Sequence, residues 1–141
     1  MTSPHPLDCP AWSALNERQS GFALAHGGAR RYDPAYGVFA AVGDRSAASL
    51  AGLGALVAEH GDVALLEVSP PTDAPGVTVA SQDLGVQMVA TRLTAGPAPD
   101  FEIIPLGDAD APEMLALATL TRPGPFFDRT HQLGDFLGVR I

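Results

Sequence analysis

Lysine is absent from this chain of 141 residues, and all eight basic residues are arginine. Sixteen acidic residues bring the formal net charge to −8 at pH 7. A chain with so few positive charges has no basic stripe that would neutralise phosphate groups. Nucleic-acid binding is therefore disfavoured, and we expect no nucleic acid among the partners.

Cysteine occurs once, as Cys9, which rules out a disulfide within the chain. Cys9 has no evident histidine partner, so we interpret it as an inert buried thiol and not as a nucleophile. The four histidines, His5, His26, His60 and His131, are scattered, with no pair at helical or C-x-x-C-like spacing. We therefore expect no metal site.

Long hydrophobic runs are also missing. No stretch reaches the roughly 18 apolar residues of a membrane-spanning helix, and the first ten residues, MTSPHPLDCP, have neither the basic nor the apolar region of a secretory signal. We expect a cytoplasmic protein with no membrane partner. Apolar residues still make up 46% of the chain, which is enough to bury a core and excludes wholesale disorder.

The first 94 residues predict a small α/β unit. A helix is expected over 8–24, with Asp8 as its N-cap and Pro10 in its first turn. A second helix is expected over 47–59, where Ser46 is the cap and leucines recur at helical spacing. Short apolar runs predict strands at 38–42, 63–68, 76–81 and 85–93.

Residues that favour turns separate these elements. Residues 26–37 read HGGARRYDPAYG and residues 69–76 read SPPTDAPG, which are typical of turns and loops. The clearest linker is AGPAPD, residues 95–100. We therefore expect one domain over 1–94 and another over 101–141.

After the linker the expected order is strand, helix, helix, strand. FEIIPL (101–106) predicts a strand, and GDADAPEMLALATLT (107–121) predicts a helix with proline and glutamate in its first turn. FFDRTHQL (126–133) predicts a short second helix or a turn. DFLGVRI (135–141) predicts a buried strand, which needs neighbours on both sides to pair its backbone.

This order, and the run LGDADAPEMLALATLTRPGPFFDRTHQLGDFLGVRI, resembles the opening of a GNAT superfamily acetyltransferase domain. The pieces GGARRYDP and GVQMVA are similar to the extra N-terminal domain of one bacterial branch of that superfamily. The resemblance implies an α/β (α+β) fold: a small mixed-sheet accessory domain, then the first strand-helix-helix-strand of a GNAT domain. It implies an acetyl-CoA-dependent N-acyltransferase whose acceptor is a small amine or a peptide.

GNAT enzymes hold acetyl-coenzyme A on a Q/R-x-x-G-x-G/A turn at a helix N-terminus, where unpaired amides and the helix dipole bind the pyrophosphate. Neither Arg92, which begins RLTAGP, nor Arg122, which begins RPGPFF, places two glycines at the required offsets. We therefore expect no cofactor-binding residues. The chain would be the N-terminal part of such an enzyme, inactive by itself, and completed by a C-terminal polypeptide or found as a homo-oligomer.

Two other hypotheses remain open. The chain could be a stand-alone interaction or scaffold module that associates with another chain through its terminal strand. It could also be an ordinary ligand-binding α/β domain, in which case residues 1–93 would pair the strand at 136–141 on both sides.

The resemblance also indicates four candidate substrate-binding residues, in the loop and turn after the helix predicted over 107–121. Phe126 and Phe127 would line the acceptor pocket, and Thr130 or His131 would face the amine. The alternative is that the two phenylalanines fill the core and that His131 lies on the surface. No residue is assigned a catalytic role.

Two charged groups complete the candidates. Arg30 and Arg31, next to Tyr32, could clamp the phosphates of the coenzyme, but in a chain of charge −8 we favour solvation or pairing with acidic neighbours. We interpret the acidic residues around the third predicted helix as surface residues or as partners of the helix dipole. These are Asp100, Glu102, Asp108, Asp110 and Glu113.

Overall fold

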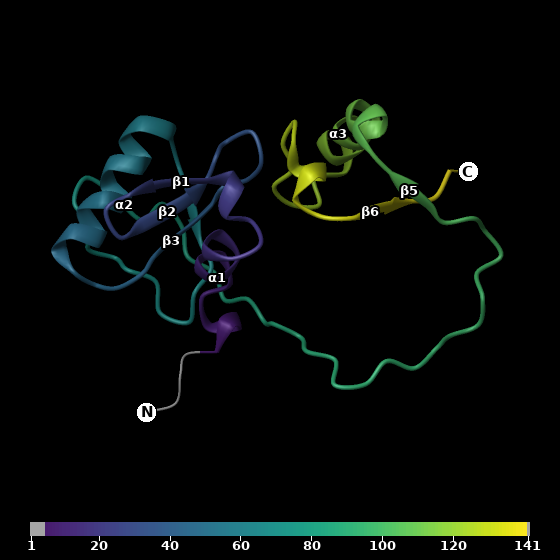
Figure 1. Cartoon of the computed structure of the whole chain (residues 1–141), viewed down its shortest axis with the longest axis horizontal. Coiled ribbons are helices and arrows are strands. Elements are labelled where there is room, and N and C mark those ends of the chain that lie inside the picture. Colours follow the sequence, from purple (N-terminus) through teal and green to yellow (C-terminus); the bar gives the residue numbers. More distant parts are fainter. Residues whose placement is uncertain (1–4, 141) are drawn as a thin grey trace.

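The computed structural model describes residues 5–140 as a mixed α/β fold with two separate sheets (Figure 1), which confirms the predicted fold class. The described residues contain three α-helices: α1 (Pro10–Asn16), α2 (Ala47–His60) and α3 (Ala111–Thr121). The strands are β1 (Ala23–His26), β2 (Ala29–Tyr32), β3 (Phe39–Val42), β4 (Ala64–Leu65), β5 (Ile104–Leu106) and β6 (Phe136–Gly138).

The larger sheet has the order β1-β2-β3-β4, antiparallel except for the parallel pair β3 and β4. Its first two strands form a hairpin where the sequence predicted the end of a helix and a turn. The helix α1 stops at Asn16, so the expectation of a helix to residue 24 is wrong. A Gly-Gly pair, with Gly27 at φ 54°, makes the two-residue hairpin turn that L-residues rarely allow.

The cap predicted for the first helix is also wrong. Cys9 is the N-cap of α1, while the Asp8 carboxylate accepts a hydrogen bond from the His5 N–H at 2.9 Å. That bond closes a separate 3-10 turn, Pro6–Asp8, just before α1. Asp8 therefore caps the turn that precedes α1 and leaves the amides of α1 itself without a side-chain acceptor.

Helix α2 agrees with its prediction. The Ser46 hydroxyl accepts a hydrogen bond from the Ser49 N–H at 3.2 Å, and the helix ends at Gly61 with φ 84°. Its leucine stripe, Leu50, Leu53 and Leu56, is buried against the alanines and Val42 of the sheet. This layer of α2 on the sheet is the core of the N-terminal part (Figure 1).

The two strands predicted over 76–81 and 85–93 are wrong, because no residue between 66 and 103 belongs to a strand. The prediction at 63–68 shrinks to the two residues of β4. Figure 1 shows this region as a long connection that leaves the first folded part and returns at β5. Strand propensity alone does not make a strand, since a strand also needs an edge to pair with.

Beyond the linker, β5 and β6 pair antiparallel, with Ile104 opposite Gly138 and Leu106 opposite Phe136. Between them lie α3 and a 3-10 helix, η4 (Thr130–Leu133), which reproduce the predicted strand-helix-helix-strand order. Within residues 5–140, β6 pairs with β5 alone. The expectation of a buried terminal strand is therefore wrong here, and no strand among residues 5–93 pairs with it.

None of the helices formed by residues 5–140 is long and apolar enough to cross a membrane.

Candidate functional site

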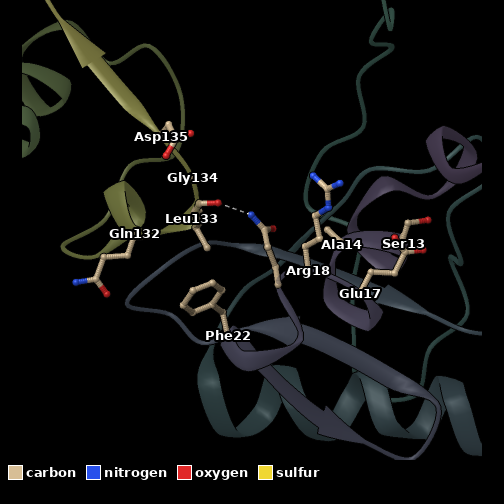
Figure 2. Close-up of a pocket in the computed structure, with 10 residues that line it drawn as sticks. Ser13, Ala14, Glu17, Arg18, Phe22, Gln132, Leu133, Gly134 and Asp135 are labelled. Carbon is tan, nitrogen blue, oxygen red and sulfur yellow. Dashed lines mark hydrogen bonds between the residues drawn. The ribbon is translucent and has the colours of Figure 1, made fainter. Parts of the chain in front are cut away.

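A cavity of about 620 Å³ lies where the C-terminal part of the chain meets the N-terminal sheet (Figure 2). One wall comes from the end of α1 and the turn that follows it, including Arg18, Gln19 and Phe22. The other wall is the backbone of residues 132–135, which lead from η4 into β6. Segments more than one hundred residues apart in sequence therefore share this cavity.

Gln19 joins the two walls. Its Nε2 donates to the Leu133 carbonyl at 2.7 Å, the bond drawn as the dashed line that ends at Leu133 in Figure 2. The amide oxygen of Gln19 accepts a hydrogen bond from the Tyr32 hydroxyl. Burial raises the pKa of Tyr32, so its hydroxyl keeps the proton that it donates. Because the amide oxygen of Gln19 accepts from Tyr32, its amide nitrogen is the atom that faces the Leu133 carbonyl.

A second set of contacts fixes η4 to the loop before β3. The Thr130 hydroxyl donates to the Tyr36 carbonyl at 2.8 Å, and the Arg129 N–H donates to the Ala35 carbonyl at 2.9 Å. The Arg129 guanidinium also lies 4.8 Å from the centre of the Tyr36 ring, within cation–π range. The Phe22 ring also packs on Tyr36, with 4.7 Å between ring centres.

The four candidate substrate-binding residues are close in sequence, and three of them take part in hydrogen bonds. The Thr130 hydroxyl, besides donating to Tyr36, accepts from the Phe127 N–H at 2.8 Å. His131 is buried, with its Nε2 2.8 Å from Asp108 Oδ1, so its placement on the surface is wrong. This hydrogen bond, with one from Gln132, lowers the pKa of Asp108. Substrate binding by the four residues stays a prediction.

Phe126 lines a second cavity, a groove of about 500 Å³ between α3 and β6. The Phe126 ring meets the Phe136 ring edge-on, with 5.9 Å between centres. Leucines of α3 and β6 make the walls apolar, and Leu137 is 66% exposed. The charged rim is formed by Arg140, which pairs with Asp110 at 2.7 Å and with Glu113 at 2.5 Å.

The arginine pair is not a phosphate clamp. Arg31 is 2% exposed, and its Nη1 donates to the Gly61 carbonyl at 2.7 Å. Arg31 therefore closes the C-terminal end of α2, where helix carbonyls lack partners. Arg30 donates to Asn16 Oδ1 at 2.7 Å. The favoured interpretation of a solvated pair is wrong for Arg31, whose pKa is lowered by burial and raised in part by Asp33.

Cys9 and the acidic residues offer no further chemistry. Burial, with a smaller effect of the Glu67 carboxylate, raises the pKa of the Cys9 thiol to about 11, so the thiol stays protonated at neutral pH. Asp110 accepts from the Gly107 N–H at 3.0 Å and helps to open α3. Over residues 5–140, no group of three or more His, Cys, Asp or Glu residues is placed to hold a metal ion.

The sequence does contain one match to the coenzyme pattern, so the expectation that it has none is wrong. Residues 18–23 read RQSGFA, which fits R-x-x-G-x-A. In an acetyl-CoA site this pattern opens a helix, but here it leaves α1, forms the 3-10 turn Ser20–Phe22 and enters β1.

Several amides of this turn already have acceptors within the chain. The N–H groups of Gln19, Ser20 and Phe22 donate to backbone carbonyls at 3.0, 3.4 and 3.0 Å. Amides that donate within the chain cannot also hold a pyrophosphate. Residues 18–23 therefore do not fit the coenzyme. They match the pattern in sequence, but their backbone does not have the geometry that the site requires.

No protein-family model matches the sequence, and no curated protein matches it significantly. Among solved structures, the crystal structure of a protein from Novosphingobium aromaticivorans DSM 12444, assigned to the GNAT family of acetyltransferases, is similar, with a TM-score of 0.71 and 39% sequence identity. The match covers 98% of this chain and 60% of the Novosphingobium chain. This chain therefore has the mixed α/β fold found in a GNAT-family protein, and it spans about three-fifths of that protein's length.

Proposed function

We propose that this chain is the N-terminal part of an acetyl-CoA-dependent N-acyltransferase of the GNAT type. Residues 1–94 would form the accessory domain, 95–100 the linker and 101–141 the first strand-helix-helix-strand of the catalytic domain. The observation that carries the proposal is the 39% identity to a GNAT-assigned protein over 98% of this chain. The order β5, α3, η4, β6 after the linker supports it.

The groove between α3 and β6 is the proposed acceptor site. Phe126 lines its apolar wall, and its three rim charges, Asp110, Glu113 and Arg140, sum to −1, which favours a cationic amine. Thr130 and His131 would act on the acceptor through the loop that their hydrogen bonds hold in place. Because residues 18–23 do not fit the coenzyme, we assign no catalytic step to this chain.

The purified chain of 141 residues is expected neither to bind acetyl-CoA tightly nor to acetylate amines. Titration calorimetry with acetyl-CoA should give no saturable binding stronger than about 1 mM. Thiol release should not rise above the uncatalysed rate with small amines or peptides as acceptors. Tight binding together with turnover would contradict the proposal. Loss of that binding in an Arg18→Ala variant would then place the coenzyme at residues 18–23.

A second candidate function, a scaffold module that associates through its terminal strand, is favoured by one observation. Among the described residues β6 pairs on one side only, and Leu137 and Val139 are 66% and 42% exposed. This function predicts a dimer with twice the 14.6 kDa mass of the chain. Size-exclusion chromatography with light scattering would measure that mass. Leu137→Asp should return the monomer mass. A monomeric wild-type chain at high concentration would exclude self-association through β6.

A further inference from the structure

The strongest unexplained feature outside both cavities is the segment LGVQMVATRL, residues 84–93, which we call the arm. Its apolar side chains are almost fully in water: Leu84 is 100% exposed, Val86 89%, Met88 93% and Leu93 88%. Folded proteins rarely expose so many large apolar side chains in one place, and such patches mark interaction sites. The arm therefore lacks a covering surface.

The arm has the pattern of a strand. In an extended chain, alternate side chains point to the same side, which puts Leu84, Val86 and Met88 on one face. Its one charged residue is Arg92, whereas the whole chain carries −8. Proline-containing segments lie on both sides of the arm in sequence, at 69–76 and 95–100. One side-chain bond ties it back, from Gln87 Nε2 to the Leu7 carbonyl at 2.6 Å.

The part of the chain that the arm leads into is also uncovered. The sheet of β5 and β6 has two strands, a size that is marginal by itself. Beside it lie the groove against α3 and the exposed Leu117 and Leu137, at 61% and 66%. The match with the Novosphingobium protein leaves a substantial part of that protein without a counterpart here.

We propose that the arm is a docking strand for the polypeptide that completes the acetyltransferase domain, packing its Leu84, Val86 and Met88 face on that polypeptide. The same polypeptide would pair with the free edge of β6. This inference rests on the proposed function. The partner's chemistry follows from the surface: an unpaired strand edge for the arm's backbone and apolar side chains for its exposed face. A net positive charge on the partner would complement the −8 of the whole chain.

A second copy of this chain fits this surface less well. Two copies would each bring a net charge of −8 to the contact, and like charges oppose association. We therefore expect no strand pairing between copies of this chain, and the experiment below would detect it as a dimer.

The test mixes the 141-residue chain with a separately expressed probe, the part of the Novosphingobium protein that this chain does not match. Hydrogen exchange of the amides of residues 84–93 should slow at least about tenfold on mixing. Met88→Asp should weaken the complex by about tenfold or more, because it places a charge on the apolar face. Thr91→Asp, which adds the same charge to the opposite face, should change the affinity by less than about threefold. Both side chains are exposed, so the folded chain tolerates either change.

Leu137→Asp on β6 separates this inference from the proposed function. If the complex forms and is weakened by Leu137→Asp but not by Met88→Asp, the arm is not a docking strand, and the proposed function stands. If no complex forms, or if the arm is protected in the chain alone with a dimer mass, the docking proposal is overturned. The proposed function is then judged by the coenzyme titration described above.

Discussion

Replacing Arg31 with methionine should lower the free energy of unfolding by about 3 kcal/mol, in the range for losing hydrogen bonds from a buried charged donor. Arg31 is 2% exposed and donates to the Gly61 and Leu56 carbonyls at 2.7 and 3.5 Å. A methionine would fill similar volume but leave both carbonyls at the end of α2 without a donor. Urea unfolding followed by circular dichroism measures the difference.

Two variants serve as controls for Arg31→Met. Arg31→Lys keeps the charge but not the fork of donors, so it should lose less stability than methionine does. Arg30→Met removes a neighbouring arginine whose bond to Asn16 is exposed, and it should change the free energy of unfolding by less than about 1 kcal/mol. Equal effects of Arg30→Met and Arg31→Met would contradict the role of Arg31 as the closing residue of α2.

The role of Arg31 could not be read from the sequence, although a signal was present. Two arginines after a Gly-Gly turn look like surface residues in an acidic chain. Their position in a strand changes this, because Arg31 then shares a face with Ala29, which is buried against α2. Recognising the hairpin would have predicted that the Arg31 side chain points inward. Its acceptor could still not have been predicted, because Gly61 is thirty positions away.

Local signals predicted α2 and α3 well, α1 only in part, and the contacts between distant segments poorly. Ser46, the leucine stripe and Gly61 fixed α2 because capping and periodicity act within a few residues. The bonds from Gln19 to Leu133 and from Thr130 to Tyr36 span 114 and 94 positions. No local pattern encodes such pairs, so Gln19 was missed as part of the site. The strand predicted over 85–93, within the arm, was wrong for the opposite reason. The local pattern favours a strand, but no strand lies beside it to pair with.

Gly52→Ala should destabilise the chain by about 3 kcal/mol, at the upper end for overpacking. Helix propensity predicts the opposite, since alanine in a helix interior is favoured over glycine by about 1 kcal/mol. The packing decides the sign. A Cβ built on Gly52 would lie 2.1 Å from the His26 carbonyl oxygen and 3.4 Å from the Ala29 Cβ. The first contact is with backbone, so α2 would have to move off the β1–β2 hairpin.

Gly21→Ala is the matched control for Gly52→Ala. A Cβ at Gly21 meets nothing within 4 Å, and the residue does not have a positive φ. We expect its free energy of unfolding to stay within about 0.5 kcal/mol of wild type. Both variants are compared by urea unfolding with the same probe. If Gly52→Ala is as stable as wild type, α2 does not lie against the hairpin closely enough to need glycine.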